Sequence, residues 1–157
     1  MNTVTHALLP VVLAKTCLGR DGQPKRWEWL ALMLAGAAPD LINPHIYLED
    51  RVTSWSHALP AWLGFTLLLL AASFVKQLRL RRALAAMMSC AYLLHIGCDL
   101  VSGGLNPLYP FGGRVVGEYW VGLVWWIPID IVLLLTCYYH FRLKDLREKA
   151  KNRVRAD

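Results

Sequence analysis

A histidine and an aspartate lie four residues apart inside a strongly apolar stretch of the chain. His95 and Asp99 belong to the segment Tyr92-Leu-Leu-His-Ile-Gly-Cys-Asp. On an α-helix this spacing places both side chains on one face, one turn apart. Neutral imidazole and carboxylate are ordinary ligands of divalent transition metals, and ionisable groups at membrane depth usually face a cavity, each other or an ion. The pair therefore predicts one wall of a metal site.

Three more residues of the same chemistry stand at the ends of other apolar stretches: His6, Asp40 and His57. Three histidines and two aspartates match the ligand set of a mono- or dinuclear hydrolytic site for Zn²⁺ or a similar ion, with a position left for water. Bound water then reaches a pKa of about 7 and becomes a nucleophile. Either carboxylate, Asp40 or Asp99, is a candidate general base if it is not a full ligand, or it orients a histidine.

These residues require elements that bring them together, and the sequence contains five apolar segments. The expected fold is all-α, a multi-spanning transmembrane helix bundle. Two segments are shorter than the roughly 20 residues of a full span and three are full spans. In order, the segments are residues 4–19 and 27–42 (short), then 58–75, 83–101 and 119–141 (full spans).

Composition agrees with a membrane protein. The 157 residues suit a single domain, and 56% of them are hydrophobic, more than is usual for a soluble domain. The net charge of +6 comes from basic residues that cluster beside the apolar segments. We therefore expect membrane lipids as partners, together with a small-molecule or lipid-linked substrate, and no nucleic acid.

The basic residues predict an orientation. Every Lys and Arg except Arg51 and Arg114 flanks alternate connections or the C-terminal tail. Because basic residues accumulate on the cytoplasmic side, we expect the N-terminus outside and the C-terminus inside. Residues 1–141 then form the membrane-embedded domain, and residues 142–157 form a basic cytoplasmic tail.

In this topology all five candidate ligands fall in the outer half of the bundle. The topology was derived from Lys and Arg alone, so the position of the ligands is an independent observation. The two outer basic residues, Arg51 and Arg114, are either solvated loop residues or hold an anionic group such as phosphate. Asn106 and Arg114 are the weaker candidates for contacts with a substrate. Asp130 is expected at mid-membrane, as the partner of a ligand histidine or as a cap of the helix at Pro128.

Four short motifs occur in order: Thr5-His6-Ala-Leu, Pro39-Asp40, Ser56-His57-Ala-Leu, and His95-x-x-x-Asp99 followed by Ser-Gly-Gly-Leu-Asn-Pro-Leu-Tyr-Pro-Phe. This set resembles the predicted membrane-bound, metal-dependent hydrolases, the family of the LexA-regulated inner-membrane hydrolases of bacteria. The resemblance extends to about residue 140. It implies a multi-pass protein of the bacterial inner membrane with a divalent metal site built from these His and Asp residues.

The chain departs from the family pattern at two places. Family members often have a second Asp two residues after the first, where this chain has Ile42. They often carry His-Arg before the third motif, where this chain has Asp50-Arg51. The differences remove possible ligands for a second metal ion, for which Asn43, His45 and Asp50 are the remaining candidates.

Two classes of function follow. The first is a hydrolase in which metal-activated water attacks an ester or phosphoester, such as a lipid-linked substrate, at the outer half of the bilayer. The second is a non-enzymatic membrane protein, an ion-binding transporter component or a scaffold, whose His/Asp cluster fastens the helices. Five segments without an inverted repeat are few for a transporter, which favours the enzyme.

Overall fold

The computed structural model describes residues 2–44, 47–144 and 146. Five α-helices carry the fold of this part of the chain: α1 (Thr3–Cys17), α2 (Glu28–Ile42), α3 (Leu59–Phe74), α4 (Arg82–Val101) and α5 (Leu123–Tyr138). Short 3₁₀ turns lie in the connections: η1 (Arg20–Gly22), η2 (Leu48–Thr53), η3 (Trp55–His57) and η4 (Lys76–Leu78). A π-helical turn, η5 (Tyr139–Leu143), continues α5.

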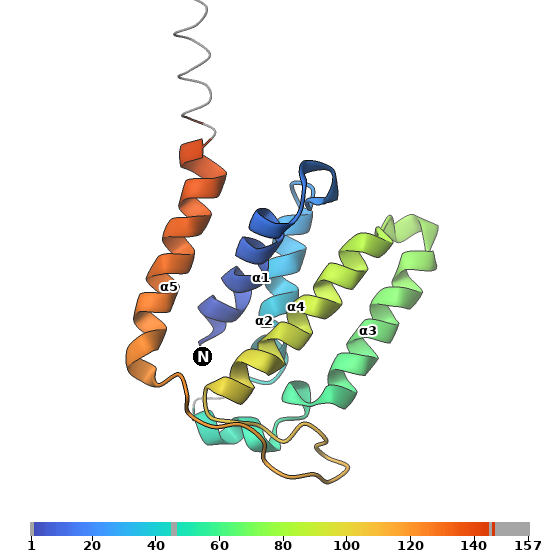
Figure 1. The fold of residues 1–157 in the computed structure, drawn as a ribbon. Helices are drawn as coiled ribbons and strands as arrows, with labels where there is room; N and C mark the ends of the chain where they lie inside the picture. Colours follow the sequence, from blue (N-terminus) through green and yellow to red (C-terminus); the bar gives the residue numbers. More distant parts are fainter. Residues whose placement is uncertain (1, 45–46, 145, 147–157) are drawn as a thin grey trace, which may run out of the picture.

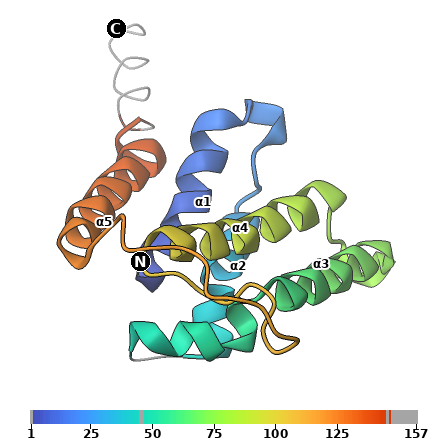
Figure 2. The ribbon, with the colours of Figure 1, turned by 60° about the horizontal axis from the view of Figure 1, so that its bottom comes forward.

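The helices α1, α2 and α4 form the centre of the bundle, with α3 and α5 on opposite sides (Figures 1 and 2). Helix α3 packs on α4, and α5 packs on α1. Successive helices run in alternate directions, so the N-terminus, η2, η3 and the loop after α4 gather at one end (Figure 1). The basic connections at residues 18–27 and 75–81 lie at the opposite end. The all-helical expectation is thus confirmed for the described residues.

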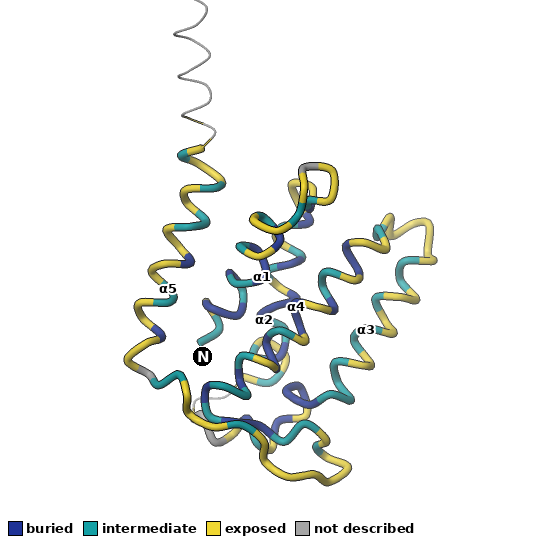
Figure 3. The backbone as a smooth tube through the Cα atoms, in the orientation of Figure 1, coloured by how far each residue is buried: buried dark blue, intermediate teal, exposed yellow. Residues whose placement is uncertain are grey.

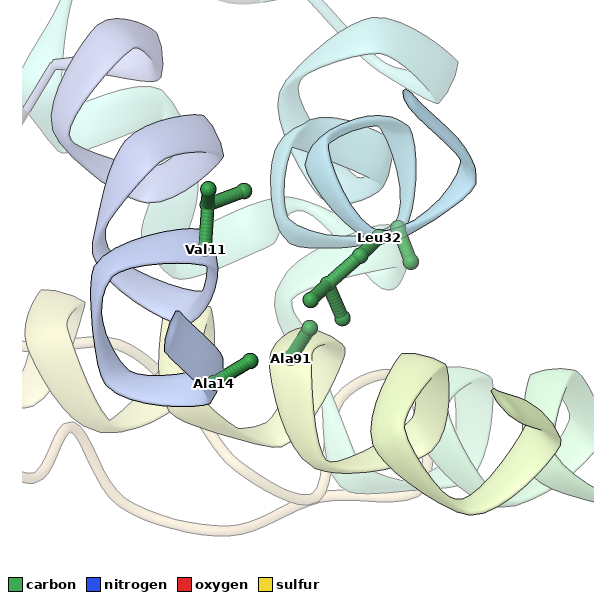
Figure 4. Close-up of a cluster of buried hydrophobic side chains, with 5 residues drawn as sticks. Val11, Ala14, Leu32 and Ala91 are labelled. Carbon is green, nitrogen blue, oxygen red and sulfur yellow. The ribbon is translucent and has the colours of Figure 1, made fainter. Parts of the chain in front are cut away.

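Small residues let the three central helices approach closely. Val11, Ala14, Leu32, Ala35 and Ala91 form a buried cluster between them (Figure 4). Because lipid tails are as apolar as these side chains, close van der Waals contact is the main force that can hold such helices together in a bilayer. The alanines provide it by removing side-chain bulk between the helix axes.

The expected number of full spans is wrong. Only α4 (Arg82–Val101) and the segment from Val124 to Leu143 are long and apolar enough, by length and composition, to cross a membrane among the described residues. The segment expected at 58–75 forms α3, which has 16 residues, because the chain turns at the basic run and Arg79 adopts a left-handed conformation (φ 48°). The last segment begins helically at Leu123 rather than 119, immediately after Gly122.

The two spanning candidates differ in their surroundings. Half of the α4 window is buried, against 11% of the α5 window. In Figure 3, α5 and α3 are mostly teal and yellow, whereas dark blue concentrates on α1, α2 and α4. Helix α5 therefore presents most of its apolar surface outward, to whatever solvent surrounds the bundle.

The loop after α4 folds back over the end of that helix. Gly103 and Gly104 have positive φ angles of 130° and 81°, which end the helix. The amides of Glu118 and Val121 then donate to the carbonyls of Leu100 and Val101, at 3.1 and 3.0 Å. These bonds satisfy carbonyls that a helix C-terminus leaves open, and they fix the loop against the end of the bundle that contains His95 and Asp99.

An ion pair between buried Glu28 and partly exposed Arg81 joins α2 to α4 at the other end. Glu28 is 1% exposed. Its carboxylate accepts from the Arg81 guanidinium through two nitrogens, Nε at 2.7 Å and a terminal amino group, and from the Lys25 amide at 2.6 Å. Because Arg81 immediately precedes α4, the pair fixes the starts of two central helices relative to each other.

Replacing Glu28 by alanine should lower the free energy of unfolding by about 1.5 kcal/mol, because it removes charge-assisted hydrogen bonds while the Arg81 side chain, 31% exposed, stays in contact with its surroundings. Thermal unfolding of the purified protein in detergent measures the effect. Arg26→Ala is the control, since Arg26 is exposed in the same connection. Equal melting temperatures for the two variants would contradict a role for this ion pair.

Candidate metal centre

The five candidate ligands come together at the end of the bundle where the chain begins. His6 lies on α1, Asp40 on α2, His57 on η3, and His95 with Asp99 on α4. The side chain of Asp40 is 12% exposed and the other four are at most 1% exposed. Four separate elements thus bring ionisable groups into one buried cluster, which the sequence analysis expected.

Four atoms form the centre of the cluster. The Oδ1 atom of Asp40 lies 3.1 Å from His57 Nε2 and 3.5 Å from His95 Nε2. The Oδ2 atom of Asp99 lies 3.5 and 3.3 Å from the same two nitrogens. Two carboxylate oxygens therefore face two imidazole nitrogens.

The proton on His95 is fixed by its other neighbour. His95 Nδ1 is 2.8 Å from the carbonyl oxygen of Gly36, and a carbonyl only accepts, so Nδ1 carries a proton. In the neutral imidazole Nε2 is then bare, and its lone pair faces the oxygens of Asp40 and Asp99. Opposed lone pairs repel, so this arrangement requires a cation between them, either a metal ion or a second proton.

His57 has a similar arrangement. Its Nδ1 lies 2.9 Å from Ser54 Oγ and 3.1 Å from Ser56 Oγ. The Ser56 hydroxyl donates to the Pro39 carbonyl at 2.8 Å, which favours a proton on His57 Nδ1 and leaves Nε2 toward the carboxylates. Burial also lowers the pKa of His57, and the neutral imidazole that results is the form that binds metal.

The spacing fits a metal ion. Four ligands arranged tetrahedrally around Zn²⁺ with bonds of about 2.0–2.1 Å lie about 3.3 Å from one another. The four measured N···O separations range from 3.1 to 3.5 Å. Metal-binding histidines usually donate their second ring N–H to a carbonyl or another acceptor, as His95 does to Gly36. Two groups of three have ligand atoms within 4.8 Å of one another and share His95: Asp40 with His57 and His95, and His6 with His95 and Asp99. The first group, with Asp99 Oδ2 3.3–3.5 Å from both imidazole nitrogens, could hold one divalent ion.

His6 lies beside Asp40 and His57 and forms the second group with His95 and Asp99. Its Nε2 is 3.2 Å from the other oxygen of Asp99, Oδ1. Its ring stacks on His95 with centroids 3.7 Å apart. His6 Nδ1 is buried without a hydrogen-bond partner among the described residues. A buried imidazole nitrogen without a hydrogen bond among the described residues therefore lies next to the candidate ligands.

From the sequence, Arg51 was either a solvated loop residue or a ligand of an anionic group. Its burial shows that solvation in a loop is wrong. It is 1% exposed. Its guanidinium donates to Asp99 Oδ1, to Ser102 Oγ at 3.4 Å and to the Ser102 carbonyl at 3.1 Å. The sequence signal was the scarcity of basic residues on this side, which comprised only Arg51 and Arg114.

The two weaker substrate candidates lie in the loop after α4. Asn106 Oδ1 accepts from the Leu108 amide at 3.3 Å, and Arg114 is exposed. Neither forms a hydrogen bond or ion pair with the five clustered residues in the described part of the chain.

The candidates for extra ligands do not join the cluster either. Asn43 donates to Ser54 Oγ at 2.9 Å, and Asp50 is exposed and accepts from the Tyr47 amide at 3.4 Å. His45 lies outside the described residues. The cluster therefore holds the five residues expected from the sequence together with Arg51.

Asp130 ties α5 to the start of α1. Its carboxylate accepts from the Asn2 side chain and from the Thr5 hydroxyl. Asn2 also caps α1 by accepting from the Thr5 amide at 3.0 Å, and Thr3 donates to Asp40 Oδ2 at 2.7 Å. The first turn of α1 is thus fixed between α5 and α2, which positions His6. Among the described residues, Asp130 does not contact a ligand histidine directly.

Comparison with known proteins places the chain in a family. The model of the YdjM inner membrane protein family matches residues 1–153. The chain belongs to this family. No curated protein and no solved structure matches it. A YdjM family member is a protein of the inner membrane by the family's description, which supports the membrane assignment from composition and from α4 and α5.

Gly36 is the contact point between α1 and α2 on which this centre depends. A Cβ at this position would collide with the His6 carbonyl oxygen and lie 2.9 Å from Pro10 Cγ. Pro10 has no N–H to donate to that carbonyl, so the His6–Pro10 turn presents backbone to α2. The glycine lets α2 reach this turn while its own carbonyl binds His95.

Gly36→Ala should therefore push α1 away from α2 and lower the free energy of unfolding by about 2 kcal/mol. Gly97→Ala is a matched control, because no atom lies within 4 Å of its added Cβ and alanine favours a helix over glycine by about 1 kcal/mol. Thermal unfolding compares the two variants. A Gly36→Ala protein as stable as Gly97→Ala would contradict the close approach.

Proposed function

We propose that this chain is a metal-dependent hydrolase of the bacterial inner membrane that acts on an ester or phosphoester. The supporting observation is the set of two imidazole nitrogens facing two carboxylate oxygens at 3.1–3.5 Å, buried at one end of the bundle. A divalent ion bound there, with Zn²⁺ as the best match to the nitrogen and oxygen donors, would activate water as a nucleophile.

Residues of the chain would supply substrate access, the general base and the remaining ligand. Asp40 is the most exposed of the five, so its side is where water and substrate enter. Its Oδ2, held by Thr3, is placed to accept the proton of the attacking water. Asp99 is held by Arg51 and His6 and serves as a ligand.

An apolar groove along the central helices suits the hydrocarbon part of a substrate. The groove has a volume of about 310 Å³ and lies between α1, α2 and α4. The groove follows the helices that carry His6 and His95 toward the end of the bundle with Cys17 and Ala86, and its lining includes none of the five clustered residues. Its lining includes Pro10, Leu13, Ala14, Leu32, Ala91 and Leu94. A lipid-linked ester or phosphoester is the substrate class that suits both features.

We place the chain in the membrane as a multi-pass protein with its N-terminus outside. The short helices α1, α2 and α3 then lie embedded beside α4 and α5, and residues 1–141 form the membrane domain. Residues 142–157 form a basic cytoplasmic tail. The support is the gathering of the basic connections at the end of the bundle opposite to the candidate metal centre.

The wild-type protein, purified in detergent without chelator, should retain a divalent metal in stoichiometric amount. His95→Ala and Asp40→Ala should lose at least nine-tenths of it, because each removes a ligand. His140→Ala, at the opposite end of the bundle, should retain it. Elemental analysis by mass spectrometry measures the content. Metal-free wild-type protein would favour the alternative, a membrane protein whose His/Asp cluster fastens helices.

Hydrolysis should depend on the same residues. Against a panel of chromogenic carboxylic esters and phosphodiesters presented in mixed micelles, the wild type should turn over at least one class. Asp40→Asn should reduce kcat by at least about 100-fold, as loss of a general base does, while metal content falls less than in Asp40→Ala. Metal-loaded wild-type protein inert toward both classes would contradict the hydrolase proposal.

Cysteine labelling tests the orientation. In a background lacking the four native cysteines, Phe111→Cys should react with an impermeant maleimide added to intact spheroplasts. Lys76→Cys should react only after the membrane is opened. The two positions lie in connections at opposite ends of the bundle. Labelling of both positions from the same side would contradict the proposed topology.

A further inference from the structure

The carboxylate of Asp99 lies between two cation positions. Its Oδ2 atom faces His57 Nε2 and His95 Nε2, the side where the four candidate ligands meet. Its Oδ1 atom faces His6 Nε2 at 3.2 Å and accepts from the Arg51 guanidinium. In two-metal hydrolytic sites the ions lie about 3.5–4 Å apart, close enough for one carboxylate to bind both, one through each oxygen.

The Arg51 side chain is buried and is held by hydrogen bonds to α4 and to the residue that follows it. The guanidinium is 1% exposed and donates to Asp99 Oδ1, to Ser102 Oγ and to the Ser102 carbonyl. Arginine keeps its proton in proteins, so this is a permanent positive charge on the second oxygen of Asp99. Ser102 follows the last residue of α4, so the guanidinium is anchored to the same helix end as the carboxylate it binds.

We propose that the Arg51 guanidinium occupies the position that a second metal ion would take in a two-metal site. The centre then binds one divalent ion, and the guanidinium supplies the remaining positive charge. The inference rests on the proposed metal-dependent function and specifies the number of ions. A second ion at Asp99 Oδ1 would meet the fixed charge of Arg51 at contact distance, where like charges repel.

The ligands for a second ion are also missing on that side. His6, His95 and Asp99 have ligand atoms within 4.8 Å of one another, but His95 Nε2 already faces Asp40 and Asp99 Oδ2 at the first position. Among the described residues of this group, that leaves His6 and Asp99 Oδ1 for a second ion. Ile42, which stands two residues after Asp40, is apolar and 49% exposed. An ion held by two protein ligands next to a guanidinium would bind weakly in comparison with one held by Asp40, His57, His95 and Asp99.

The arrangement has a consequence for the ligand that the centre attracts. Asp40 and Asp99 carry two negative charges, while Arg51 and one divalent ion carry three positive charges. The buried centre with its ion then has a net charge of +1 when the histidines are neutral. An anionic oxygen, such as that of a phosphodiester, is attracted to this charge more strongly than a neutral carboxylic ester is.

Manganese titration of the full chain in nanodiscs tests the number of ions. Wild-type protein stripped with chelator should bind one equivalent of Mn²⁺ and give the electron paramagnetic resonance spectrum of an isolated ion. Two equivalents with an exchange-coupled spectrum would overturn this inference and leave the proposed function standing. Binding of no ion would overturn the proposed function itself.

Two substitutions examine the role of Arg51. Arg51→Lys keeps the charge and should still bind one equivalent. Arg51→His replaces the cation by a third potential ligand beside His6 and Asp99 Oδ1, and should admit a second, exchange-coupled equivalent. A folded Arg51→His protein that binds one equivalent would overturn the inference. If Arg51→His does not fold, the wild-type titration decides by itself.

Discussion

Two carboxylates buried beside apolar helices need positive charge or hydrogen-bond donors around them, and the cluster is arranged to meet this need. Asp99 is fully buried, and its two oxygens meet His6 and Arg51 on one side and His57 and His95 on the other. His95 lies on the same helix as Asp99, whereas His6, Arg51 and His57 come from α1, η2 and η3. The compensation of one carboxylate therefore sets the positions of α1, η2, η3 and α4 relative to one another.

The outer parts of the structure support the same arrangement. Asp130 brings α5 to the first turn of α1 through Asn2 and Thr5, and Thr3 on that turn reaches Asp40. Ser56 joins η3 to α2 through the Pro39 carbonyl and supports the ring of His57. Side chains outside the cluster thus hold its members by hydrogen bonds, which orient ligands more narrowly than packing alone.

The sequence was sufficient to predict the helical segments and the five clustered residues, because apolar length, helical spacing and the distribution of Lys and Arg are local properties of the chain. It overestimated α3, since the apolar run continues toward a turn that begins at Val75. It left Arg51 unresolved because a side chain in a 3₁₀ connection follows no periodic pattern, and its partner Asp99 lies 48 residues away. The role of Gly36 depends on contact between two helices, which composition does not reveal.

The lengths of the first three helices have a consequence for the surrounding lipid. Helices of 15 and 16 residues extend about 22–24 Å along their axes, whereas the hydrocarbon layer of a bilayer is about 30 Å thick. Such a hydrophobic mismatch is relieved in part by local thinning of the bilayer. If α1, α2 and α3 are embedded as proposed, the lipid headgroups around them descend toward the level of Asp40, which shortens the path from the headgroup layer to the cluster.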